Sequence, residues 1–147
     1  MYTALDREFS EPIFRLFTER TGIAVAAQYD TESTKTVGLA NRIRAERGRP
    51  RCDVFWNNEV LNTIRLEEEG LLQAVAPRNA DLYPAAYRDP GGSWFGFAAR
   101  ARVLIVNTAL VPDGPFPSSV RDLGAPAWKG KTAIAKPLFG TTASHVA

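Results

Sequence analysis

Apolar and polar positions alternate between helical and strand-like spacing along the first half of the chain. Within residues 7–21, four apolar side chains recur at the spacing of one helical face, and Gly22 follows as a helix stop. These four are Phe9, Ile13, Leu16 and Phe17. Residues 23–29 then form an apolar run typical of a strand. The pattern therefore predicts a helix followed by a strand.

The same order repeats once more. Apolar residues at helical spacing between Val37 and Ile43 predict a second helix, which Gly48 ends. The short run 52–56 is typical of a strand buried in a parallel sheet. A third helix is expected to begin at Glu59 and to run to Gly70.

The start of that third helix carries two asparagines, Asn57 and Asn58. Asparagine is a preferred N-cap residue, so one of these two is expected to cap the helix. Strands that alternate with helices through short connections indicate βαβ units. The predicted fold class is therefore α/β, with a mainly parallel sheet flanked by helices.

The character of the sequence changes after Leu72. Residues 73–93 are rich in Pro, Ala, Asp and Gly, as turns and loops are. Further on we expect three strands and two helix starts. The strands are predicted at 94–99, 103–107 and 132–135, a short helix is capped by Ser118 or Ser119, and another helix begins within 141–145.

The length, the net charge and the single cysteine and histidine of the chain exclude several classes of function. The chain has 147 residues and a net charge of +2, which is too balanced to predict nucleic acid or an anionic membrane as a partner. No apolar run approaches the ~18 residues of a membrane span. No export signal is visible at the start. Cys52 and His145 are the only residues of their kinds, which excludes an internal disulfide and a Cys/His zinc site.

Four strand-to-helix junctions carry polar, small or glycine residues, at 3–6, 30–36, 57–59 and 139–142. In open α/β sheets, ligands bind at the carboxyl ends of the strands, against helix N-termini that favour anions. One such junction alone is best explained as a helix cap, but four together favour a binding cleft. Arg100 and Arg102 share one face of a predicted strand, where they either clamp an anion or form solvated ion pairs.

Sequence templates for catalysis are missing. The chain has no G-x-S-x-G, no G-x-x-x-x-G-K-[ST], no G-x-G-x-x-G and no obvious carboxylate pair. We therefore expect a binding protein and not an enzyme.

Seven segments of the chain form an ordered series: YTALDREF (2–9), FTERTGI (17–23), YDTESTKT (29–36), DVFWNNE (53–59), GFAARARV (96–103), WKGK (128–131) and PLFGTT (137–142). This series resembles the ferric-iron-type extracellular solute-binding proteins of bacterial ABC importers. Each segment is weak by itself, but their order and spacing match the family along nearly the whole chain.

The resemblance implies a truncated type II periplasmic binding protein fold, in which two α/β lobes close on a ligand. Residues 1–102 would belong to the first lobe, without the return segment that completes it. Residues 103–147 would supply a crossover strand and the beginning of the second lobe.

The resemblance also implies a site and its ligand, Fe³⁺ with a synergistic anion. The principal metal ligands would lie beyond Ala147, and Asp6 and Glu59 would be metal-side donors. Where some members have a His and a Glu, this chain has Asp6 and Asn58. The expected ligand-binding residues are Leu5, Asp6, Thr34, Asn58, Glu59, Arg100, Gly140, Thr141 and Thr142.

Two other functions stay open on the sequence alone. One is metal-free capture of a phosphonate or another small organic anion by the same fold, and the other is a ligand-free sensor or structural fragment. The expected partners are a small solute or metal and a membrane permease, with no nucleic acid. The expected location is periplasmic or extracellular, and the chain by itself is expected to self-associate.

Overall fold

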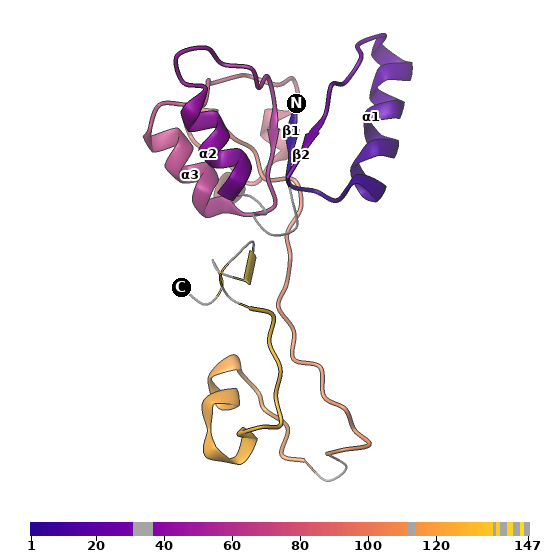
Figure 1. The fold of residues 1–147 in the computed structure, drawn as a ribbon, viewed down its shortest axis with the longest axis vertical. Helices are drawn as coiled ribbons and strands as arrows, with labels where there is room; N and C mark the ends of the chain where they lie inside the picture. The colour runs from indigo at the N-terminus through magenta and orange to yellow at the C-terminus, as the bar shows by residue number, and fades with distance from the viewer. Residues whose placement is uncertain (31–36, 112–113, 137, 139–140, 143–144, 146–147) are drawn as a thin grey trace. The chain divides into compact units, whose positions relative to one another are not determined.

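The computed structural model describes residues 1–30, 37–111, 114–136, 138, 141–142 and 145 (Figure 1). The chain divides into two compact units. The first holds residues 1–96 and 136–147, and the second holds residues 97–135. These two units are compact parts of this chain and do not test the lobes of a longer two-lobed fold. The lobe boundary expected after residue 102 therefore stays a prediction.

The first helix is confirmed. Helix α1 covers Arg7–Thr21, and Gly22 ends it in the left-handed region with a φ of 74°. In that conformation the Gly22 N–H donates to the carbonyl oxygen of Thr18 at 2.8 Å. Glycine suits this position because a Cβ would disfavour the left-handed region.

The predicted parallel sheet is also confirmed. Its strands are β1 (Tyr2–Thr3), β2 (Gln28–Tyr29) and β3 (Phe55–Trp56), in the order β2-β1-β3, and both pairings are parallel. The outer strands are shorter than the expected runs 23–29 and 52–56. The reason is that β1 lies at the centre and is only two residues long, so each neighbour pairs with it over two residues.

The sheet separates α1 from the other two helices (Figure 1). Side chains alternate between the faces of a strand. Tyr2 is buried and its hydroxyl donates to Glu46, just after α2. On the opposite face, the ring of Trp56 meets Phe14 of α1 edge-on, with ring centroids 5.9 Å apart. Alternate residues of the strands therefore contact different helices.

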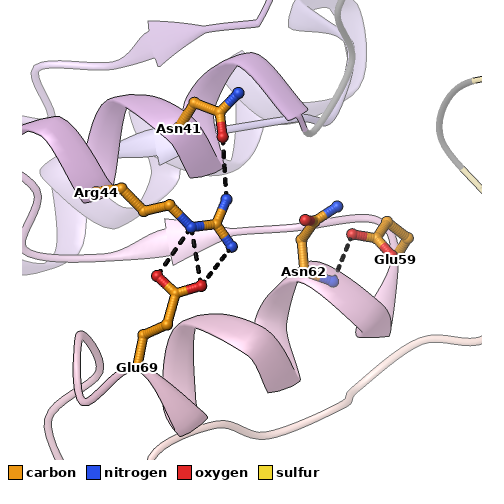
Figure 2. Close-up of polar contacts among 5 residues, drawn as sticks. All are labelled: Asn41, Arg44, Glu59, Asn62 and Glu69. Atoms are coloured by element: carbon orange, nitrogen blue, oxygen red, sulfur yellow. Dashed lines mark hydrogen bonds and ion pairs between the residues drawn. The ribbon is translucent and has the colours of Figure 1, made fainter.

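Helices α2 (Val37–Ala45) and α3 (Val60–Glu68) confirm the second and third helical patterns. Leu39, Ala40 and Leu66 are buried in the first unit. Figure 2 shows a polar link between the helices: Arg44 bonds Glu69 at 2.8 Å and donates to the side-chain oxygen of Asn41.

The cap predicted for α3 is wrong. Glu59 is the N-cap residue, and neither Asn57 nor Asn58 takes that role. The side-chain oxygen of Asn57 accepts from the Asn58 N–H at 2.8 Å, and its amide donates to Thr63 at 3.0 Å. Asn57 therefore forms a local turn before the helix, which moves the helix start to Val60.

Beyond Gly70 the described elements are short. They are the 3₁₀ helices η1 (Ala80–Leu82), η2 (Ala85–Tyr87), η3 (Val120–Gly124) and η4 (Pro126–Trp128). Ser119 caps η3 with a reciprocal contact to Asp122, which confirms the helix expected after the serines. Thr141, Thr142 and His145 are helical, in agreement with the helix start expected there.

The three later strands are not formed. Residues 94–99, 103–107 and 132–135 contain no strand, and one isolated bridge joins Phe95 to Arg88. A strand needs a neighbour for its backbone groups. Ile105 is 90% exposed, so the apolar pattern of 103–107 is present without a surface that covers it. Among the described residues, every helix is too short or too polar to cross a bilayer.

Candidate functional site

The carboxyl ends of the three strands meet at one edge of the sheet. The Ala4 N–H donates to the carbonyl oxygen of Trp56 at 3.0 Å, and the Asp30 N–H donates to that of Thr3 at 3.2 Å. The described residues of three predicted junctions therefore share this edge, and residues 31–36 of the second junction lie outside the described residues. At the fourth junction, Phe139 and Gly140 lie outside the described residues.

Asn58 fixes two of these junctions to each other. Its side-chain amide donates to the carbonyl oxygen of Ala4 at 2.9 Å, although the two residues are 54 positions apart. Leu5, the next residue, donates its N–H to the Thr3 hydroxyl at 3.1 Å. The predicted site residues Leu5 and Asn58 are therefore brought together at the ends of β1 and β3.

Asp6 occupies the N-cap position of α1. Its carbonyl oxygen accepts from the N–H groups of Phe9 and Ser10, both at 3.1 Å, while its carboxylate makes no capping hydrogen bond. Asp6 lines a shallow, open pocket of about 460 Å³. The pocket is lined by Ala4, Leu5, Asp6, Arg7, Glu8, Tyr29 and Asp30. Asp6 is thus placed at a concave part of the edge.

Glu59 is engaged as a helix cap. One carboxylate oxygen accepts from the Leu61 N–H and the other from the Asn62 N–H, each at 2.9 Å. Figure 2 shows the contact with Asn62. N–H groups in the first turn of a helix have no backbone partner within the helix, so the carboxylate satisfies them. The positive end of the helix dipole also stabilises the negative charge of the carboxylate. A metal ion at Glu59 would have to compete with both hydrogen bonds.

Arg7 is a residue of this edge that sequence reasoning missed. Its guanidinium lies 5.1 Å from the centre of the Tyr29 ring, at the end of β2, and it pairs with Glu11 at 3.1 Å. A cation over an aromatic face is favourable. The sequence feature that could have pointed to Arg7 is its position directly after Asp6, at the strand-to-helix junction. Arg7 lines the pocket together with three acidic residues, Asp6, Glu8 and Asp30.

Of the remaining predicted residues that the structure describes in the first unit, Asn58, Glu59, Thr141 and Thr142 are not among the lining residues of this pocket. Arg100 is exposed and belongs to the second unit, so its role at the edge stays a prediction. Thr141 and Thr142 belong to the first unit, and Thr142 is 8% exposed. Thr34 and Gly140 lie outside the described residues. Within the described part of the chain, no three His, Cys, Asp or Glu side chains gather as a metal site would require.

A polar cluster lies on the α2 face of the sheet. The Tyr2 hydroxyl donates to Glu46 at 2.7 Å, and Arg42 bonds Glu46 at 3.0 Å and lies over the Tyr2 ring. The hydrogen bond from Tyr2, followed by the contact with Arg42, lowers the pKa of Glu46. Burial, followed by the hydrogen bond to Glu46, raises the pKa of Tyr2. Burial also raises the pKa of Cys52 nearby and favours its thiol form. This cluster is structural, and it lies away from the pocket at the edge.

The chain matches a known family over most of its length. Residues 57–146 match the model of the bacterial extracellular solute-binding proteins. The chain belongs to this family, whose members are solute-binding proteins and not enzymes.

Individual proteins are similar as well. The chain is 30% identical to iron uptake protein A1 of a Synechocystis species, over 91% of this chain and 36% of that protein. It is also 30% identical to the Fe(3+)-binding periplasmic protein of Serratia marcescens, over 80% of this chain and 33% of that protein.

Among solved structures, iron-bound HitA from Pseudomonas aeruginosa matches with a TM-score of 0.76 at 30% identity. The match covers 86% of this chain and 40% of that one. The likeness establishes the periplasmic-binding-protein fold, and the chain spans 33–40% of the length of these proteins.

Proposed function

We propose that this protein is the substrate-binding component of a bacterial ABC importer and that it carries ferric iron, alone or as an iron–anion complex. The observation that carries the proposal is the likeness to iron-bound HitA, which combines a TM-score of 0.76 with 30% identity. The names of the two relatives support the same ligand. In the importer, a membrane permease would receive the iron.

The chemistry of the sheet edge supports a hard cation. Fe³⁺ prefers oxygen donors, and Asp6 supplies a carboxylate in the pocket, with Glu59 as a second donor if its cap opens. Two carboxylates do not fill the coordination sphere of Fe³⁺. The other donors would come from residues outside this pocket, as the two-lobed fold implies.

The anion would be held by groups of a different kind. Thr141 and Thr142 are helical, and the positive end of a helix dipole favours an anion. Arg100 and the segment 140–142 are the anion-side residues of the proposal. A lobe boundary after residue 102 would place Arg100 at the end of the first lobe and 140–142 in the second.

A second candidate is metal-free binding of a phosphonate or similar anion. The observation that favours it is the engagement of both Glu59 carboxylate oxygens by the α3 backbone. In that case Glu59 is a cap only, and the ligand would contact Arg7 and the helix starts.

Calorimetry with ferric citrate and with methylphosphonate, on the protein in the length its gene encodes, separates the two. Asp6→Ala combined with Glu59→Ala is expected to weaken ferric binding at least tenfold. Glu68→Ala, at the exposed far end of α3, is the matched control and should bind as the parent does. Unchanged ferric affinity in the double variant would show that neither Asp6 nor Glu59 is an iron donor. Binding of methylphosphonate without binding of ferric citrate would show that the ligand is an organic anion and not iron.

A further inference from the structure

Loop 4–6, which joins β1 to α1, has a side chain bonded to a backbone group of each of its residues. The carbonyl oxygen of Ala4 accepts from the side-chain amide of Asn58 at 2.9 Å. The N–H of Leu5 donates to the hydroxyl of Thr3 at 3.1 Å. Two of the three loop residues are therefore held by side chains that come from different strands of the sheet or their ends.

The third contact holds Asp6 itself. Its carbonyl oxygen accepts from the Ser10 hydroxyl at 3.1 Å, in addition to the N–H groups of Phe9 and Ser10. These contacts fix the Asp6 backbone at a φ of −59° and a ψ of 144°, and with it the direction in which the side chain leaves the loop. The side chains of Thr3, Ser10 and Asn58 together form the loop clamp.

The loop clamp shapes the pocket at the sheet edge, because all three residues of loop 4–6 line that pocket. Thr3 and Ser10 are fully buried, and Asn58 is half-buried. A hydrogen bond is stronger in such surroundings, where the local dielectric is low. The wall of the pocket that carries Asp6 is therefore held from below by buried contacts.

Helix formation does not explain Ser10. Alanine is the better helix former, and it could be buried there without a hydroxyl that needs a partner. The hydroxyl of Ser10 donates to the carbonyl oxygen of Asp6. What serine adds at this position is a hold on Asp6.

We propose that Thr3, Ser10 and Asn58 are positioning residues of the binding site, which hold the Asp6 carboxylate in place before the solute arrives. The inference rests on the proposed function, because it requires a solute at this edge. A loop that is already ordered loses less conformational freedom on binding. When only a fraction of the molecules holds the loop correctly, the apparent affinity falls by that fraction.

In this account Asn58 acts through Asp6 and does not contact the solute. Its amide is engaged by the carbonyl oxygen of Ala4, two residues before Asp6. Because Asn58 lies between β3 and α3, its contact also ties loop 4–6 to the start of α3. Thr3 and Ser10 hold the same loop from its two ends.

Calorimetry with ferric citrate, on the protein in the length its gene encodes, measures the effect on binding. Ser10→Ala and Thr3→Val should each weaken binding about fivefold, the factor that one net hydrogen bond is worth. Thr3→Ser keeps the hydroxyl and should restore most of the affinity. Thr21→Ala is the matched control, because the Thr21 hydroxyl donates to the Phe17 carbonyl oxygen in the same way, at the far end of α1.

A double-mutant cycle separates positioning from a general effect on stability. In an Asp6→Ala background, Ser10→Ala should weaken ferric citrate binding no further, because the carboxylate that Ser10 positions is gone. A general loss of stability would weaken binding in both backgrounds. Urea unfolding of each variant confirms that it is folded under the conditions of the titration.

Hydrogen exchange without ligand tests the loop clamp independently of any solute. The peptide covering 4–10 should exchange severalfold faster in Ser10→Ala than in the parent, while peptides of α2 should not change. Thr21→Ala should leave the 4–10 peptide as it is in the parent. An unchanged 4–10 peptide in Ser10→Ala would show that the hydroxyl does not hold the loop, and would overturn the proposal.

The titrations distinguish failure of this proposal from failure of the proposed function. A parent protein that binds no ferric citrate overturns the proposed function and, with it, the role of the loop clamp in binding. A parent that binds ferric citrate while Ser10→Ala has no effect overturns the positioning role alone. An effect of Ser10→Ala that is equal with and without Asp6 does the same.

Discussion

The side-chain amide of Asn58 donates a hydrogen bond to the carbonyl oxygen of Ala4 at 2.9 Å. This contact joins the ends of β1 and β3 where the backbone pairing stops. It places the loop that carries Asp6 beside the start of α3. The relative position of the two predicted donors, Asp6 and Glu59, therefore depends on Asn58.

Asn58→Ala is expected to lower the free energy of unfolding by about 1 kcal/mol, because a net hydrogen bond is lost at a part-buried carbonyl. Urea unfolding followed by circular dichroism measures the change. Asn79→Ala is the matched control, since Asn79 is exposed and makes no capping hydrogen bond. Equal stability of the two variants would show that the Asn58 contact adds nothing to the fold.

Replacing the capping residue of α3 should separate capping from ligand binding. Glu59→Ala is expected to cost about 1 kcal/mol of stability, the usual loss for a helix N-cap, whereas Glu59→Ser should retain most of it because serine caps well. Thermal unfolding of both variants gives the comparison. If Glu59→Ser is as unstable as Glu59→Ala, the carboxylate stabilises the chain in some way other than capping.

The cluster of Tyr2, Glu46 and Arg42 predicts a pH dependence. The pKa of Glu46 is lowered in the folded chain, so its contribution to stability is present above its ordinary pKa of 4.5 and is lost as the pH falls through the folded value. The pKa of Tyr2 is raised above 10.0, so its contribution is present below that pH and is lost as the pH rises through the folded pKa.

Tyr2→Phe removes the hydroxyl that links these groups. Near neutral pH the variant should be less stable than the parent, and the difference should shrink as the pH falls below the ordinary pKa of Glu46. Urea unfolding between acidic and neutral pH measures it. A stability difference that stays constant across this range would contradict the assigned role of the Tyr2–Glu46 hydrogen bond.

Substitution of Gly22 tests the cost of backbone conformation separately from the cost of side-chain packing. A Cβ at Gly22 meets no atom within 4 Å, but the φ of 74° is left-handed. Gly22→Ala is therefore expected to cost about 1–2 kcal/mol through backbone strain alone. Gly48→Ala also meets open space and has no left-handed φ, so it should be neutral or slightly stabilising. The same cost at both glycines would remove the conformational explanation.

Local patterns in the sequence predicted local structure well. The spacing of apolar residues before Gly22 predicted α1, and the serines before Val120 predicted the cap of η3. The order of strands and helices predicted parallel pairing. In each case the determining interactions lie within a few residues, or follow from how strand–helix–strand units connect.

Contacts between distant residues were beyond sequence reasoning. Asn58 resembled a helix cap, and its actual partner is the carbonyl of Ala4, 54 residues away. Tyr2 and Glu46 are 44 residues apart, and no spacing rule joins them. The run 103–107 has strand composition, but strand formation depends on a neighbour that composition does not reveal. The ligand-binding assignments at Thr34 and Gly140 stay predictions, outside the described residues.

We propose that an iron-bearing solute binds at the carboxyl edge of the sheet. Hydrogen exchange by mass spectrometry, on the protein in the length its gene encodes and with or without ferric citrate, tests this placement of the site. Peptides covering 4–8 and 57–61 should exchange severalfold more slowly with ligand, while those covering α2 should not change. Binding of ferric citrate that leaves both edge peptides unchanged, or that protects α2 instead, would contradict the account.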